Sequence, residues 1–421
     1  MSRHLCVSVL LVFTVLSLGW SQCCFADDPT TVPTSGAKGS DSFVPDAHAA
    51  STYFVIPIHD EIGVVTTADM VKKMLAQADR VMPSIVILDV NSPGGMVSAC
   101  DDITDLLIKW QTHSHVRVVS FVSKSAFSAA AVISMSSHEI YMVPNSTIGA
   151  AMIVLDHAKG WDIYNDPNWN GVTEKMASAY RAQDRAVVEF GGHDPLLLEG
   201  MSSTNIELWM AKDKDGKPKI YRGPDTGTSR RSSQFNHTDN GQSPDGAPLP
   251  PANATLFLKR GKILTLTGEE AVACGLANGE VDDLPMLLTT LGLSGATEAS
   301  NVGIKLIDQR SHQVDTLRSE FLRHIQVVSR SREQAYSVGN DVDLLSQKQQ
   351  DLQKVLASIS RIRDLVRLNP WLLREDADSF DTRLGSVKTW VESTLSSDQR
   401  TIDRLTASHG QQTIIHVRPQ Q

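Results

Sequence analysis

Two short segments of this chain carry the residue types that acyl-transfer chemistry needs. Asn91-Ser92-Pro93-Gly94-Gly95 follows an apolar run, and Ser125-Ala126-Phe127-Ser128-Ala129-Ala130-Ala131 follows a second one. A Gly-Gly pair lets two strand ends approach closely and leaves backbone N–H groups pointing into the gap, which is how an oxyanion hole is built. A serine at the start of a helix lies where the helix dipole favours negative charge. These segments together predict a serine nucleophile beside an oxyanion hole.

Residue spacing alone leaves three candidates for the nucleophile, namely Ser123, Ser125 and Ser128. A serine among alanines also commonly serves as a small residue that lets a helix pack closely on a sheet. The two glycines also have a purely structural explanation, because a Gly pair often serves only to allow the backbone conformation of a tight turn.

The elements that must position these segments alternate along residues 52–155. Apolar, β-branched runs alternate with helical patterns, and this alternation is typical of a parallel sheet with crossover helices. Active sites of such sheets lie at the carboxyl ends of the strands, where both segments are expected. We expect strands near residues 53–58, 85–90, 116–122 and 139–143, and helices near 67–78, 98–111 and 125–135.

At these residues the chain resembles the ClpP/crotonase superfamily, and more narrowly the NfeD-type, ClpP-class serine proteases that act at membranes. The resemblance implies an α/β fold of ββα repeats. It also implies that Ser128 is the nucleophile. The oxyanion donors would be the N–H group of Gly95 or Met96 and the N–H group of Ala129, and Gly94 would contact the substrate or the oxyanion. The matching segments are residues 54–63, 93–95, 126–130, 142–151 and 264–276.

The general base is the residue that the resemblance does not supply. The position of the histidine of ClpP is similar to Ala151, and the lysine position of the NfeD-type Ser/Lys dyad is similar to Arg185. Arginine stays protonated and cannot take a proton from Ser128. Three alternatives follow: Lys175 on the same helix acts as base, Arg185 contacts a substrate carboxylate or the oxyanion while another group is the base, or the fold has lost its hydrolytic chemistry.

The ends of the chain indicate export and a second module. An apolar run after Arg3 predicts a signal peptide over residues 1–26, and a Thr/Ser/Pro-rich stretch predicts a disordered linker over 27–50. The protease-like domain is expected over 51–296, with an insertion at about 204–262 that begins with a hairpin, either a flap over the site or an oligomer contact. Apolar residues at seven-residue spacing predict a coiled-coil-like helical module over 300–410.

Composition restricts the function classes. The chain has 421 residues, 41% of them hydrophobic, and a net charge of −9, so it lacks the basic excess that a nucleic-acid backbone requires. No metal-ligand spacing is present, and neither a metal nor a cofactor is expected. Removal of the signal peptide would leave Cys100 and Cys274, expected as buried thiols rather than a disulfide.

These observations predict an exported serine peptidase, periplasmic or otherwise extracytoplasmic, that hydrolyses peptide bonds through an acyl-enzyme on Ser128. The resemblance implies peptide or membrane-protein substrates. We also expect a homo-oligomer. Because the appended module has no apolar run long enough to span a bilayer, a link to the membrane is expected through a membrane-protein partner or through the N-terminus. Two competing classes remain: a catalytically inactive scaffold, and a crotonase-like acyl-CoA enzyme.

Overall fold

The computed structural model describes residues 51–157, 160–163, 171–223, 249–331, 338–373 and 377–412, and for 154–157, 160–163, 171–178 and 409–412 it describes the backbone alone. The predicted signal peptide and linker over residues 1–50 lie outside these ranges. So does the part of the predicted insertion over residues 224–248.

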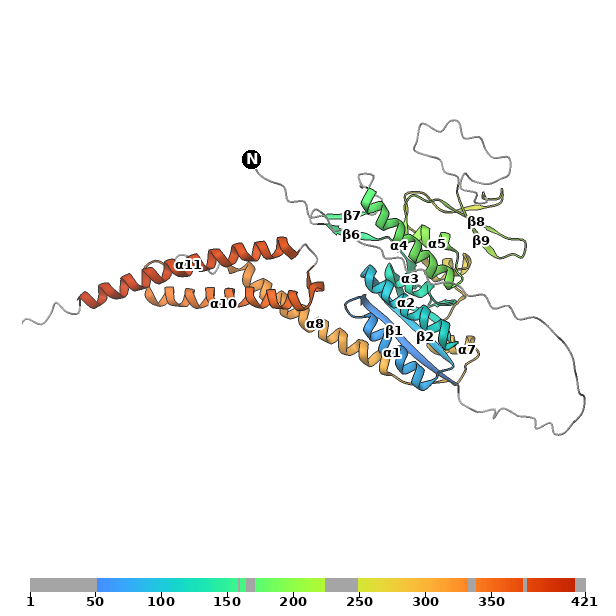
Figure 1. Cartoon of the computed structure of the whole chain (residues 1–421), viewed down its shortest axis with the longest axis horizontal. Helices are drawn as coiled ribbons and strands as arrows, with labels where there is room; N and C mark the ends of the chain where they lie inside the picture. The colour runs from blue at the N-terminus through green and yellow to red at the C-terminus, as the bar shows by residue number, and fades with distance from the viewer. Residues whose placement is uncertain are drawn as a thin grey trace, which may run out of the picture. The chain divides into compact units, whose positions relative to one another are not determined.

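A mainly parallel sheet forms the core of the described chain (Figure 1). Its four central strands run parallel and are joined by α1, α2 and α3, so the predicted α/β class is confirmed. Two further short strands, β12 (Gly279–Glu280) and β13 (Thr297–Glu298), pair in parallel with β4 and β1. The central elements are β1 (Thr52–Ile62), α1 (Ala68–Val81), β2 (Ile85–Gly95), α2 (Val97–Ser114), β3 (Arg117–Phe127), α3 (Ala129–Met135) and β4 (Glu139–Met142).

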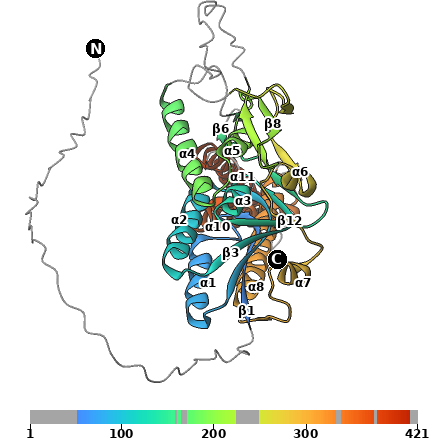
Figure 2. The ribbon, with the colours of Figure 1, turned by 90° about the vertical axis from the view of Figure 1, so that its right-hand side faces the viewer.

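Both faces of the sheet are buried, which explains why its strands are almost continuously apolar. Successive side chains of a strand point to opposite faces. In β2, Val86 and Leu88 therefore join the larger core with α1 and α2, whereas Ile85 and Ile87 join a second cluster with Leu287 of α7 (Leu284–Thr290). Figure 2 shows α1 and α2 on one side of the strands and α7 on the other.

Two strands extend further than the sequence analysis predicts. β2 continues through Gly95 and β3 through Phe127, because these polar ends find strand partners. Gly94 and Gly95 pair with the end of β1, and Ser125, Ala126 and Phe127 pair with β5 (Thr147–Gly149). The prediction that the Gly-Gly pair forms a turn after its strand, and that a helix begins at Ser125, is therefore wrong, since α3 begins at Ala129.

A second group of elements follows the sheet strands. The β8–β9 hairpin is present at the predicted position, and β10 pairs with β8 on its other side. The Asp213 carboxylate accepts hydrogen bonds from the N–H groups of Asp215 and Lys217, which closes the hairpin turn. These elements are β6 (Val154–His157), β7 (Gly160–Ile163), α4 (Gly171–Phe190), α5 (Pro195–Ser202), β8 (Leu208–Lys212), β9 (Pro218–Arg222), β10 (Thr255–Leu258), β11 (Thr265–Thr267) and α6 (Gly268–Ala273).

The C-terminal region is helical, with α8 (Val302–Ser329), α10 (Val342–Leu368), a short 3-10 turn η1 (Pro370–Leu372) and α11 (Ala377–Gln412). Figure 1 shows α10 and α11 side by side. Their contact is a cluster of buried side chains that includes Leu352, Val355, Ile359 and Ile362, all at positions of the predicted seven-residue pattern. No helix in the described ranges is both long and apolar enough to span a bilayer.

One buried ion pair links two helices of this region, and its loss is expected to destabilise them. The Lys348 Nζ lies 2.9 Å from the Asp398 Oδ2, and the two side chains are only 8% and 12% exposed. Lys348→Ala would leave a buried carboxylate without its cation, at a cost of about 3–5 kcal/mol in the free energy of unfolding of the helical region. Urea denaturation followed by far-UV circular dichroism measures this loss.

The matched control for this prediction is Lys354→Ala on the same helix. The exposed Lys354 side chain pairs with Asp351 at 2.8 Å, and an exposed pair contributes only about 0–1 kcal/mol. Equal effects of the two substitutions would contradict a structural role for the Lys348–Asp398 pair.

Candidate active site

The ends of β1 and β2 are held together at the Pro-Gly-Gly segment. Gly95 lies opposite Ile62 in the strand register, so close that a Cβ atom on Gly95 would stand 2.1 Å from the Ile62 carbonyl oxygen. The Ser92 hydroxyl fixes the segment from the other side. It donates a hydrogen bond to the Asp60 carbonyl and accepts one from the Gly94 N–H at 3.1 Å. Glycine is therefore required at position 95 by this close approach.

Ser128 occupies an unusual backbone conformation between β3 and α3. Its φ of 54° and ψ of −124° are rare for a residue with a side chain. The surrounding structure holds it there, because the Ser128 N–H donates to the Gly149 carbonyl at 2.9 Å and the Ser128 carbonyl accepts from the Ala131 N–H. Such a strained strand-to-helix position exposes the hydroxyl in enzymes with a nucleophilic serine.

Gly94 brings the two segments into direct contact. It has a φ of +94°, and a Cβ atom there would lie 2.6 Å from the Ser128 Cβ and 3.2 Å from its Oγ. The Pro-Gly-Gly backbone thus faces the serine side chain without an intervening group. This proximity is expected of two segments at the carboxyl ends of neighbouring parallel strands.

Two backbone N–H groups can serve as oxyanion donors beside Ser128. The Met96 N–H donates to the Ile62 carbonyl at 3.0 Å, so it is directed at β1 and is already used. Because successive N–H groups of a strand point to opposite sides, the Gly95 N–H is directed away from β1, to the side of β2 on which β3 lies. The Ala129 N–H is the first of α3 and has no acceptor within that helix.

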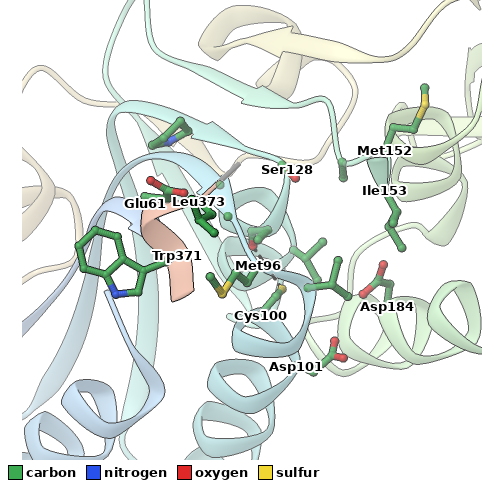
Figure 3. A pocket seen from close by; sticks show the side chains of 17 residues that line it. Glu61, Met96, Cys100, Asp101, Ser128, Met152, Ile153, Asp184, Trp371 and Leu373 are labelled. Atoms are coloured by element: carbon green, nitrogen blue, oxygen red, sulfur yellow. Dashed lines mark hydrogen bonds between the residues drawn. The ribbon is translucent and has the colours of Figure 1, made fainter. Parts of the chain in front are cut away.

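A cavity of about 740 Å³ opens beside these groups (Figure 3). It contains Gly94, Gly95, Met96, Ser128 and Ala129, so the structure brings these five predicted site residues together. The side chains of its apolar wall come from several elements. They are Met96, Val97, Val132, Ala151, Met152, Ile153, Trp371 and Leu373.

The helical region also contributes to this cavity. Trp371 and Leu373, at and just after η1, line it together with Glu61 of β1. Arg318 of α8 places its guanidinium 2.6 Å from a Glu61 carboxylate oxygen and 5.7 Å from the centre of the Trp371 ring. Because Glu61 pairs with Gly94 in the strand register, these contacts connect α8 and η1 to the serine site.

Arg185 and Lys175 are the two basic residues expected near the serine, and both lie in α4. Arg185 of α4 is exposed and lines a separate cavity of about 350 Å³. It is not among the residues that line the Ser128 cavity. Lys175 lies in α4, where the structure describes its backbone but not its side chain. Within the described ranges, no recorded hydrogen bond joins a side chain to the Ser128 hydroxyl.

The position that is similar to the ClpP histidine is filled by Ala151, which is buried and lines the cavity. His138 is exposed, and its ring packs against Phe190 at a centroid distance of 5.3 Å. The His157 side chain lies outside the described residues. The β8–β9 hairpin contributes no described residue to the Ser128 cavity.

Two acidic side chains and a thiol are among the cavity residues that the sequence did not indicate. Asp184, one residue before Arg185 on α4, lines the Ser128 cavity, as do Asp101 and Cys100 of α2. Burial and the neighbouring Asp101 carboxylate raise the pKa of Asp184 to about 7. Burial likewise raises the pKa of the Cys100 thiol, so it stays protonated. The described residues contain no group of three His, Cys, Asp or Glu side chains that could hold a metal ion, and Cys100 and Cys274 are free, buried thiols.

Comparison with known proteins agrees with the motif resemblance. Residues 52–220 match the family model described as NfeD1b, N-terminal domain. The membrane protein NfeD1b of Bacillus subtilis (strain 168) is 26% identical over 245 residues, which are 58% of this chain and 42% of that protein. The match thus spans less than half the length of this relative. The resemblance to NfeD-type proteins is confirmed.

Two solved structures have partial similarity to this chain. One is the 1510-N membrane protease specific for a stomatin homolog from Pyrococcus horikoshii, with 18% identity and a TM-score of 0.32 over 57% of this chain and 79% of that one. The other is a ClpP1 mutant from Listeria monocytogenes, with 13% identity and a TM-score of 0.31 over 55% of this chain and 94% of that one.

Proposed function

We propose that this protein, whose residues 52–220 match the NfeD1b N-terminal domain, is a serine peptidase. It would cleave peptide bonds through an acyl-enzyme on Ser128. The observation that supports it most is the placement of Ser128. Its strained backbone directs a small hydroxyl side chain into a cavity, directly against the Gly94 backbone. A residue that only packed a helix on a sheet would not require this conformation.

In the proposed reaction the Ser128 Oγ attacks the carbonyl carbon of a bound peptide. The Gly95 and Ala129 N–H groups donate hydrogen bonds to the carbonyl oxygen as it becomes negative, and each such donor contributes about 3–4 kcal/mol to lowering the barrier. The leaving amine departs as the acyl-enzyme forms, and water then releases the acyl group. The Met96 N–H, held by Ile62, takes no part.

The apolar wall of the cavity supports peptides with apolar side chains as substrates, including segments of membrane proteins. We also propose export by the predicted signal peptide, self-association, and a membrane-protein partner for the helical region over about 300–410. The organisation into residues 1–26, 27–50, 51–296 and 300–410 is part of the same proposal.

Peptide cleavage tests this function. The purified protein is incubated with a mixture of apolar and polar peptides, and new termini are identified by mass spectrometry. The proposal expects cleavage at apolar positions that disappears with Ser128→Ala. Cleavage that persists in Ser128→Ala would contradict it, and a folded protein that neither cleaves nor reacts with acylating reagents would favour the scaffold alternative.

A further inference from the structure

A second cavity, of about 520 Å³, adjoins the Ser128 cavity on the side of the helical region. We call it the outer cavity. Glu61, Trp371 and Leu373 line both cavities, so the two meet along these residues. Figure 3 shows the three side chains on one side of Ser128 and Asp184 on the other. The other described residues that line the outer cavity are Arg318, Phe321, Leu322, Ile325, Leu372 and Phe380.

The outer cavity has an apolar lining without an unbalanced charge. Phe321, Ile325 and Phe380 line it and pack against the buried cluster of the helical region. The rings of the two phenylalanines lie 6.3 Å apart, centre to centre. The charged residues among the described lining are Arg318 and Glu61, and these form an ion pair with each other. The lining therefore suits an uncharged, apolar segment.

The outer cavity is also open to a ligand. Leu322 of α8 lines it and is 57% exposed, although its side chain is apolar. Single exposed leucines are ordinary on protein surfaces, but this one continues an apolar lining. A volume of about 520 Å³ lies within the range of ligand pockets, which is roughly 300–1,000 Å³.

Trp371, the aromatic side chain that the two cavities share, is held in place from the end of β1. Arg310 Nε donates a hydrogen bond to the Val64 carbonyl at 2.9 Å, and an Arg318 nitrogen lies 2.6 Å from a Glu61 carboxylate oxygen. The two guanidinium groups also lie 5.9 and 5.7 Å from the centre of the Trp371 ring. Because β1 pairs with β2 along its whole length, these contacts fix Trp371 relative to the serine site.

We propose that the outer cavity is a second subsite for the peptide that Ser128 attacks, and that it binds apolar side chains of this peptide away from the scissile bond. The proposal rests on the proposed peptidase function. Continuity with the Ser128 cavity favours the substrate over a second copy of the chain as the occupant. Leu322 and Trp371 are then specificity-determining residues, and the helical region selects substrates. Both lie beyond residues 52–220, so the family match does not imply this subsite.

The test compares the cleavage of an equimolar mixture of synthetic peptides by the full-length wild type and by Leu322→Asp. Mass spectrometry of the products gives the residue preference at each position on both sides of the cleaved bond. The wild type is expected to prefer apolar residues beside this bond and again at outer positions on one side of it. A carboxylate at position 322 is expected to remove the preference at the outer positions alone, because it places a charge in the apolar cavity.

Two peptides that differ only at an outer position, with leucine in one and serine in the other, give the size of the effect. The wild type is expected to favour the leucine peptide by about 10-fold or more in kcat/KM. Leu322→Asp is expected to bring this ratio close to one, and Trp371→Ala is expected to lower it as well. A folding defect would lower the rates for both peptides equally and leave the ratio unchanged.

Leu344→Asp is the matched control. It makes the same substitution at a leucine of α10 that is 48% exposed and lines neither cavity, so the ratio is expected to stay at the wild-type value. A small fluorophosphonate without a peptide part reports on Ser128 alone. It is expected to label Leu322→Asp at the wild-type rate.

The outcomes distinguish this inference from the proposed function. A folded Leu322→Asp variant that keeps the outer preference would overturn the subsite and leave the peptidase. If this variant also changes its oligomeric state in light scattering, the outer cavity would be assigned to a contact between copies.

If the wild type cleaves no peptide, the same mixture is passed over immobilised wild type and Leu322→Asp. Retention of apolar peptides by the wild type alone would keep the docking site and overturn the peptidase. Equal retention by the two proteins, or retention by neither, would overturn the docking site as well.

Discussion

Replacement of Ser128 by alanine is expected to lower the rate of peptide hydrolysis by about 10⁴-fold or more, which is the order of loss when a nucleophilic serine is removed. The residue loses only its hydroxyl oxygen, and alanine bears the same backbone strain at a φ of 54° as serine does. The Ser128 hydroxyl is also absent from the hydrogen bonds recorded among the described residues, so no structural bond is broken. The Tm is therefore expected to stay within a few degrees of the wild type, measured by differential scanning calorimetry.

The matched control is Ser125→Ala, three residues earlier at the end of β3. The Ser125 hydroxyl donates to the Asn91 side chain at 3.4 Å and does not line the Ser128 cavity. Hydrolysis by this variant is expected to remain near the wild-type rate. If Ser125→Ala lost activity while Ser128→Ala kept it, the nucleophile would have been assigned to the wrong serine of this segment.

Gly94→Ala is expected to lower hydrolysis by about 1,000-fold, without a change at any side chain that reacts. A methyl group at position 94 would collide with the Ser128 Cβ at 2.6 Å and with the Phe127 carbonyl at 2.7 Å. The φ of +94° also disfavours any side chain at this position. The collision moves the nucleophile away from the Gly95 donor. A displacement of about 1 Å lowers the reaction rate roughly 100-fold, and the misaligned oxyanion donor lowers it further.

Gly192→Ala separates the collision from the backbone strain. Gly192 also has a positive φ, of +77°, but a Cβ atom there would meet nothing within 4 Å. This variant is expected to lose some stability and to keep its turnover rate once folded. Steady-state kinetics of both variants at a temperature well below their melting points measures the difference, and similar turnover of the two would contradict a site built on the Gly94–Ser128 contact.

The central sheet and the serine segment were accessible from the sequence because their signals are local. Residues 85–90, for example, are apolar at every position except Asp89, which is typical of a strand buried on both faces. The strand ends were misjudged for a physical reason. Polar residues after Val90 and Val122 suggest a turn, and only the partners on β1 and β5 decide that these residues remain extended.

The two aspartates that line the Ser128 cavity, Asp101 and Asp184, could not be predicted from the sequence in the same way. A helical pattern indicates which residues of α4 share a face, but not which turn of that face meets the Ser128 cavity. The sequence therefore indicates Lys175 and Arg185 as the basic residues of this helix, and nothing in it marks Asp184 as a residue of the cavity wall. Trp371 presents the same difficulty, since 243 residues separate it from Ser128 and only the tertiary fold brings them to one cavity.

The most direct test of the whole account is the intact mass of the purified protein after reaction with a fluorophosphonate probe. The account predicts one adduct per chain, located at Ser128 by peptide mapping and absent from Ser128→Ala. A folded protein that acquires no adduct, or acquires one at another residue, would contradict an activated Ser128 and favour a scaffold that has kept the cavity without its chemistry.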